Sequence, residues 1–370
     1  MRFTDKDALM RAMHGGDHPG KFFDSAIRSA TGQFYDSTGA FLVGELERLD
    51  QTLNMPLQEF EWMKHIQLRE DATIADDVTS YTVSTFGNVS GTGFGNGIGN
   101  GKAWAGRRTT QAGNVSLDIA KIANPLNIWL QEISYTIPEL ESAAKLGRPV
   151  DQQKFDALGR IHQRDIDEMV HLGDTELLDS TGTPITGLWN HSLVSKYGTQ
   201  AVVATGVSGY TSWANKTAAE ILKDINAALA AVWAQSGWAV MPDTIALPPA
   251  QLAYIANQPV TLAGSESILS YVLDKNIARV EHGVDLKFTK SKYLIGTDTT
   301  NPNIGTMLGN GGLDRMVVYT NDKRYVRYPM TLLQRTPIQY DSIYHKTSYF
   351  CKLGCVEAVY PEVIGYFDGI

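Results

Sequence analysis

The first stretch whose spacing suggests chemistry is FGNVSGTGFGNGIGNGKAWAGRR, residues 86–108, in which glycine occupies every second position from Gly91 to Gly101. Glycine-rich loops cradle phosphates in two common motifs, each with a fixed spacing. The dinucleotide motif G-x-G-x-x-G does not occur between residues 91 and 101. A P-loop would need glycine in place of Asn96 and a hydroxyl residue in place of Ala103. The ladder therefore does not predict a phosphate site, and we expect no bound cofactor.

Glycine at every second position has a different physical meaning. It leaves one face of an extended chain bare, and it costs so much backbone entropy on ordering that the segment becomes fixed only against a partner. The sequence therefore predicts a flexible interaction loop whose basic end pairs with acidic groups on a neighbouring molecule. The residues expected to make these contacts between subunits are Gly91, Gly95, Gly99, Lys102, Arg107 and Arg108.

A second candidate is HQRDIDEMVHLGD, residues 162–174, which is rich in carboxylates and histidine. On a helix Asp165 and Glu168 share a face and could form a carboxylate pair for acid–base work. Arg160 and Arg164 lie close enough in sequence to neutralise them. Exposed helix charges usually form such pairs, so this run predicts a solvated or interface ion network.

The remaining reactive residues form no catalytic or metal-binding pattern. His14 and His18 have the i, i+4 spacing of zinc ligands, but they straddle GGD, which does not favour a helix, and further ligands are missing. Cys351 and Cys355 lack neighbouring ligands and are interpreted as two reduced residues in a sheet. The segment GLWNHSLVS lacks the glycines of a nucleophile elbow. We therefore expect no metal site and no enzyme.

Composition limits the class of protein further. The 370 residues are 43% hydrophobic and 19% charged, which is enough for a large core. A formal net charge of −8 disfavours a uniformly basic surface for gripping nucleic acid. No stretch reaches the roughly 18 apolar residues of a membrane span, so no membrane partner is expected.

Two elements should project from the fold. AFLVGELERLDQTLNMP predicts a short amphipathic helix with Phe41 and Leu46 on its apolar stripe, closed by Pro56, and we expect both residues to contact another subunit. VTSYTVSTF and NVSLDIAKI alternate like strands on either side of the glycine ladder, which predicts a long two-stranded excursion. Such an arm has no core of its own, so it should lie against a neighbour.

The rest of the chain predicts helices and sheets. ELESAAKLG starts one helix after Pro138, and Asp151 caps a second that runs to about Leu172, where Gly173 stops it. Residues 182–210 are interpreted as a connector, and helices alternating with strands from about 185 to 325 predict an α/β domain. The strands after residue 325 should return to the sheet beside the long helix, which makes the α/β domain an insertion.

This order of parts resembles the major capsid proteins of tailed bacteriophages, the Hong Kong 97-like fold shared with encapsulins. FLVGELERLD, the run from PELESAAKLG to HLGD, TGLWN and the ending PEVIGYFDGI are similar to one branch of that family. The resemblance implies an α+β fold with an N-terminal arm, an extended β-loop, a peripheral domain with a long spine helix, and an inserted α/β axial domain. It implies a spine region from Asp156 to Asp174. The implied ranges are 1–60 for the arm, 76–118 for the loop, 61–75, 119–182 and 326–370 for the peripheral domain, and 183–325 for the axial domain.

The resemblance implies a structural protein that self-assembles through hexamers and pentamers into the icosahedral head enclosing phage DNA, without sequence-specific binding. Only about forty residues precede the arm helix, so a separate scaffolding protein, or processing before residue 1, is expected. A portal and a decoration protein are further possible partners, with assembly in the host cytoplasm and residence in the virion capsid. Two alternatives stay open: an encapsulin-like nanocompartment shell and an enzyme that uses the α/β domain.

Overall fold

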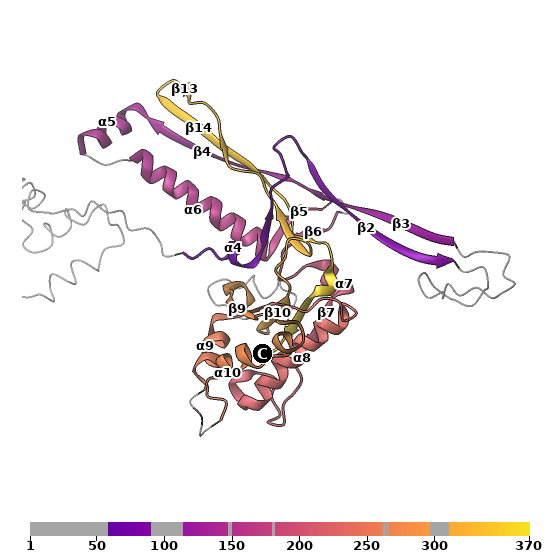
Figure 1. Cartoon of the computed structure of the whole chain (residues 1–370). Coiled ribbons are helices and arrows are strands. Elements are labelled where there is room, and N and C mark those ends of the chain that lie inside the picture. Colours follow the sequence, from indigo (N-terminus) through magenta and orange to yellow (C-terminus); the bar gives the residue numbers. More distant parts are fainter. Residues whose placement is uncertain are drawn as a thin grey trace, which may run out of the picture. The chain divides into compact units, whose positions relative to one another are not determined.

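The computed structural model describes residues 58–89, 114–146, 150–179, 182–261, 264, 266–296 and 311–370. The predicted arm helix with Phe41 and Leu46, and the whole glycine ladder, lie outside the described residues. Everything below concerns the described part of the chain, in which α-helices and β-sheets are mixed (Figure 1).

A five-stranded sheet has the strand order β7-β16-β10-β8-β9. Its central strand β10 is antiparallel to both neighbours, whereas the outer pairs are parallel. Helix α8 (Ala218–Gln235) contacts β7, β10 and β16 and buries Ile225 and Leu229 in the core. The strands are β7 (Thr199–Val202), β8 (Thr244–Leu247), β9 (Lys287–Lys290), β10 (Arg315–Tyr319) and β16 (Ile364–Asp368), and the smaller helices are α9 (Pro249–Asn257), α10 (Ile268–Asp274) and α11 (Ile277–His282).

A second sheet is built around β14 (Tyr344–Leu353), which pairs antiparallel with β4 (Asn127–Thr136) along the full length of both strands. The short strands β12 (Gln334–Arg335) and β13 (Gln339–Asp341) also pair with β14. Helix α5 (Ile137–Leu146) follows β4, and the long helix α6 (Val150–His171) contacts β4 and the short helix α4 (Trp62–His65). This sheet therefore packs beside the long helix.

The remaining strands form three smaller units. β1 (Gln67–Arg69), β11 (Val326–Pro329) and β15 (Glu357–Ala358) make a three-stranded sheet. β2 (Val78–Val89) and β3 (Asn114–Pro125) form a two-stranded hairpin, as do β5 (Gly173–Leu178) and β6 (Pro184–Thr186). The other short elements are helix α7 (Ser192–Tyr197) and the 3-10 helices η2 (Trp213–Asn215), η3 (Lys292–Leu294) and η4 (Pro361–Val363).

Local signals in the sequence explain several boundaries. The predicted helix from Asp151 to about Leu172 is present as α6, although it begins at Val150, so that Asp151 lies in its first turn and does not cap it. Gly173 follows the helix with φ +78°, a conformation that suits glycine. Helix α8 begins with a capping box in which the backbone N–H of Thr217 donates to Glu220 Oε2 at 2.8 Å. Pro249 starts α9, as expected for a residue without an N–H.

Two expectations about the fold are wrong. Residues 182–210 are more than a connector, because His191 Nδ1 accepts the N–H of Leu193 and caps the short helix α7. The strands after residue 325 do not all lie beside the long helix: β14 does, but β16 enters the five-stranded sheet between β7 and β10. All five residues of β16 are buried, and a strand buried on both faces needs such a central position.

Apolar residues at helical spacing along the long helix predict one buried stripe, made of Phe155, Leu158, Ile161, Ile166, Met169 and Leu172. Leu158, Ile166 and Met169 are buried, as the stripe predicts. Phe155 and Ile161, nearer the start of α6, are 49% and 37% exposed. This end of the helix therefore presents apolar side chains that the described part of the chain covers only in part, for example by the contact of the Phe155 ring with Tyr349.

Gly173→Ala and Gly159→Ala should shift stability in opposite directions. A Cβ on Gly173 would lie 2.2 Å from the Ile185 carbonyl oxygen, at a positive φ, so this change should destabilise the protein by more than about 1 kcal/mol. A Cβ on Gly159, inside α6, meets nothing within 4 Å, so alanine there should stabilise by about 0.5–1 kcal/mol. Urea unfolding of both variants checks this, and equal effects would contradict the backbone geometry.

Candidate functional site: a two-stranded hairpin and its buried anchors

The residues predicted to contact other subunits all lie outside the described residues. They are Phe41, Leu46, Gly91, Gly95, Gly99, Lys102, Arg107 and Arg108. What the structure does describe is the pair of strands that leads to the ladder and the contacts that hold those strands to the rest of the chain.

The expectation of a two-stranded excursion is confirmed. β2 and β3 pair antiparallel in register from Val78 opposite Pro125 to Val89 opposite Asn114. Figure 1 shows them as a ribbon whose far end leads into the undescribed segment. Val78, Leu117 and Ile119 are exposed to 52%, 60% and 60%. Leu117 and Ile119 lie two positions apart and so face the same side, which leaves an apolar face uncovered by the described chain.

The root of the hairpin is held by a buried carboxylate. Glu357, in β15, has a side chain with no exposed surface. The guanidinium of Arg69 in β1 donates to both of its oxygens at 3.1 Å, and Arg327 in β11 donates to Oε2 at 2.7 Å. Two arginines offset the desolvation of one buried carboxylate, and the three groups join all three strands of the small sheet.

Further hydrogen bonds connect the Glu357 cluster and β14 to β2 and to the residues just before it. The same Arg69 guanidinium donates to the Ser80 carbonyl in β2 at 3.3 Å, and the Tyr81 hydroxyl donates to the Ala358 carbonyl at 3.3 Å. Burial, followed by the nearby carboxylate of Glu357, raises the pKa of Tyr81 to about 12, so the hydroxyl keeps its proton to donate. Lys352 in β14 adds bonds to the Asp76 carbonyl and to Asp77, each at 2.7 Å.

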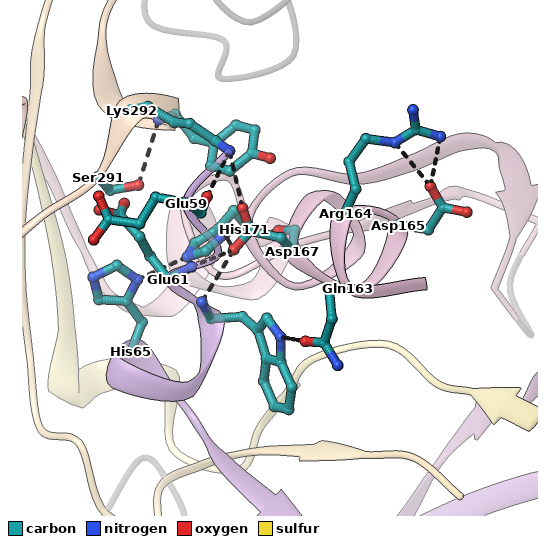
Figure 2. Close-up of polar contacts among 12 residues, drawn as sticks. Glu59, Glu61, His65, Gln163, Arg164, Asp165, Asp167, His171, Ser291 and Lys292 are labelled. Carbon is teal, nitrogen blue, oxygen red and sulfur yellow. Dashed lines mark hydrogen bonds and ion pairs between the residues drawn. The ribbon is translucent and has the colours of Figure 1, made fainter. Parts of the chain in front are cut away.

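A second buried cluster joins the segment before β1 to the long helix. Asp167 in α6 is fully buried, and its Oδ1 accepts the backbone N–H groups of Glu61 and Trp62 at 3.0 Å each (Figure 2). Lys292 of η3 approaches Oδ2 at 3.2 Å and also donates to the Glu59 carbonyl. Burial alone would raise the pKa of Asp167, but the hydrogen bond and charge of His171, the Glu61 N–H and Lys292 lower it overall.

Two buried histidines complete the cluster. His171 Nδ1 lies 2.7 Å from the Asp167 carbonyl oxygen, which can only accept, so Nδ1 carries a proton. His171 Nε2 lies 2.8 Å from His65 Nδ1, so one of these two nitrogens donates a proton to the other. His65 Nε2 is buried and has no hydrogen-bond partner in the described chain. Burial, together with His171, lowers the pKa of His65 to about 3.

The sequence reading of residues 162–174 was therefore only partly right. Asp165 and Arg164 do form the expected ion pair at 3.0 Å. Asp167 and His171, however, are fully buried rather than part of a solvated face. No local signal could reveal this, because their partners Glu61, Trp62 and His65 lie more than 100 residues away in the chain.

Among the residues that the structure describes, no group of three or more His, Cys, Asp or Glu side chains could hold a metal ion. Cys351 and Cys355 are both free and buried, and burial raises the pKa of each thiol to about 12. None of the helices in the described ranges is long and apolar enough to cross a membrane. The arrangement positions a hairpin and fixes a junction between segments.

Solved structures of phage capsids share this fold. The capsid of the myovirus XM1 matches with a TM-score of 0.66 and 15% identity, covering 88% of this chain and 98% of that one. Mycobacterium phage Ogopogo matches with a TM-score of 0.53 and 11% identity, covering 91% and 99%, and the capsid of cyanophage P-SCSP1u with 0.51 and 11%, covering 92% and 96%. No curated protein sequence matches the chain. The fold is thus that of capsid proteins of tailed phages.

The sequence itself gives the family. Residues 101–370 match the family of major capsid proteins, which is well over half of the chain. The protein belongs to the major capsid protein family, and its role in the capsid is structural. The resemblance noted in the sequence is confirmed at the level of the family and of a mixed helix and sheet fold.

Glu357→Gln should destabilise the protein measurably. The change leaves Arg69 and Arg327 beside a neutral amide, but both guanidinium groups keep some contact with solvent and Arg69 stays paired with Asp71, so the expected cost is about 1–3 kcal/mol. Asp341→Asn is the matched control, because its pair with Lys346 is exposed and should be worth less than about 1 kcal/mol. Urea unfolding measures both. A loss below 1 kcal/mol for Glu357→Gln would contradict the anchoring role.

Stability should fall as the pH drops from about 6.5 toward 3. The folded-state pKa of His65 is about 3, below the ordinary 6.5, so in this window the unfolded chain binds a proton that the folded chain does not. One such proton changes the unfolding free energy by at most about 1.4 kcal/mol per pH unit. His191, whose pKa burial lowers to about 4, acts in the same direction.

Comparison with His65→Asn isolates the contribution of His65. The asparagine amide can donate or accept a hydrogen bond toward His171 but does not titrate. The free energy of unfolding, measured by urea at pH 7, 6, 5 and 4, should depend less on pH in the variant than in the parent. Identical slopes would show that His65 does not have its low folded-state pKa.

Proposed function

We propose that the protein self-assembles through hexamers and pentamers into the icosahedral head that encloses the DNA of a tailed phage. Membership of the major capsid protein family supports this. The observation that carries the proposal is the β2–β3 hairpin, which is firmly anchored at its root but has Leu117 and Ile119 uncovered along its length. A neighbouring copy would supply the missing cover.

The domain assignment is part of the same proposal. Residues 1–60 form an N-terminal arm, 76–118 an extended loop, and 183–325 an inserted axial domain. Residues 61–75, 119–182 and 326–370 form a peripheral domain in which α6 is the spine helix. The 22-residue length of α6 and its contact with β4 support this role. β16 would then tie the peripheral segment to the axial sheet.

The partners follow from the same role. The head would require a portal, a separate scaffolding protein and, in some heads, a decoration protein, and it would assemble in the host cytoplasm. The net charge of −8 suits a container that confines DNA without adhering to it. Catalysis has no part in this function.

Electron microscopy of the purified protein tests the proposal directly. Closed shells are expected under some assembly condition, and only monomers or small closed oligomers under every condition would contradict it. Leu117→Ser combined with Ile119→Ser should fold with an unchanged melting temperature, because both side chains are exposed, yet reduce the yield of shells at least tenfold. The conservative pair Leu117→Ile and Ile119→Leu is the control and should assemble normally.

A further inference from the structure

We propose that a groove at the end of α6 receives Arg107 and Arg108 of a neighbouring copy of this chain. The inference rests on the proposed function, since it assumes that copies assemble, and it adds the surface that takes the basic end of the glycine ladder. The occupant is residues 102–108, KAWAGRR, of the second copy.

The groove has an apolar interior with an acidic rim. It has a volume of about 420 Å³ and lies between β4, α6 and β5. Met169 and Leu353 are buried, and Trp129 and Leu177 are half-buried. Glu168 and Glu176 are exposed. The lining residues are Asn127, Ile128, Trp129, Asp165, Glu168, Met169, Gly173, Asp174, Thr175, Glu176, Leu177 and Leu353.

The rim carries negative charge that the described chain does not neutralise. Four carboxylates line the groove, from Asp165, Glu168, Asp174 and Glu176, and no lysine, arginine or histidine does. Asp165 is paired with Arg164, but no ion pair within 4 Å joins a described cation to the other three. Although Glu168 is exposed at its surface, partial desolvation raises its pKa, and the carboxylates of Asp165 and Asp174 raise it further, whereas the charges of Arg164 and Lys292 lower it. A cation entering the groove would relieve this repulsion.

The segment KAWAGRR matches both features. Lys102, Arg107 and Arg108 supply three positive charges, and Trp104 between them supplies a large apolar side chain. Arginine pairs with carboxylates through two parallel hydrogen bonds, which favours it at such a rim. Tryptophan is among the residues that most often anchor an interface in an apolar pocket.

Arg107 and Arg108 are too far from the root of the hairpin to reach the groove of their own copy. The groove begins at Asn127, just beyond the root of the hairpin, and β3 runs from there to Asn114 while paired with β2 throughout. From Pro125 to Asn114 an extended strand covers about 36 Å at roughly 3.3 Å per residue. Arg108 lies six residues beyond Asn114 and can reach back only about 20 Å even when fully extended. A second copy must therefore supply Arg107 and Arg108.

Charge reversal on each side and on both sides together tests the proposal. Glu168→Lys with Glu176→Lys, and separately Arg107→Glu with Arg108→Glu, should each reduce shell yield at least tenfold at low salt. In the chain with all four changes, every copy carries positive charge at positions 168 and 176 and negative charge at positions 107 and 108. The two sides attract again, so the shell yield should recover. Glu266→Lys with Glu281→Lys is the matched control: both residues are exposed, away from the groove, and give the same change in net charge.

Each outcome decides the matter. If the parent forms no shells, the proposed function fails. If the parent forms shells and the groove variant forms them equally well, or if the four-fold variant folds but does not recover, the pairing is overturned while the function stands.

A mixed-disulfide experiment covers the case in which a reversal variant does not fold. Thr175→Cys and Arg107→Cys chains, co-assembled and oxidised, should give a disulfide-linked dimer on a denaturing gel, since the native cysteines are buried. Glu281→Cys in place of Thr175→Cys should give none. Equal dimer from both pairings would overturn the assigned groove.

Discussion

The hairpin depends on one buried carboxylate. Glu357 has no contact with solvent, and its charge is tolerated only because Arg69 and Arg327 bind it from two neighbouring strands. Removing water from a carboxylate is costly, so the three strands that carry these groups cannot separate without leaving a charge unpaired. Because Arg69 also donates to the Ser80 carbonyl, the same group holds β2 against the small sheet.

The Asp167 cluster plays a similar role for the segment that precedes β1. A single carboxylate in α6 accepts the backbone N–H groups of Glu61 and Trp62, at the start of α4, and lies beside Lys292 of η3, so it holds two separate segments against the long helix. Both clusters place buried charge where segments distant in sequence meet. In a shell subunit this rigidity matters, because an arm that reaches a neighbour delivers its contacts accurately only if its root does not move.

Sequence reasoning succeeded where the signal was local. Alternation along VTSYTVSTF and NVSLDIAKI predicted two strands, which the structure extends to residues 78–89 and 114–125 and pairs antiparallel. Gly173 and the Thr217 capping box marked helix ends, because a positive φ and unpaired N–H groups impose requirements on nearby residues. The α6 stripe was right for Leu158 and Ile166 but not for Phe155, which the described chain leaves exposed.

What the sequence could not predict depended on distant partners. Asp167 and His171 look like members of a polar helix face until Glu61 and His65 close over them. Glu357 lies in a short strand, and nothing in the sequence around Arg69 or Arg327 indicates that either arginine pairs with it. β16 looked like one more terminal strand, but its pairing with β10 and the buried Asp368–Arg315 ion pair place it in the five-stranded sheet.

A reconstruction of the assembled particle at side-chain resolution tests the central claim most directly. The account predicts that β2 and β3 keep the anchors at Glu357 while Leu117 and Ile119 are covered by a neighbouring copy. A closed shell in which both faces of the hairpin remain in solvent, or in which the hairpin folds back onto its own subunit, would contradict it.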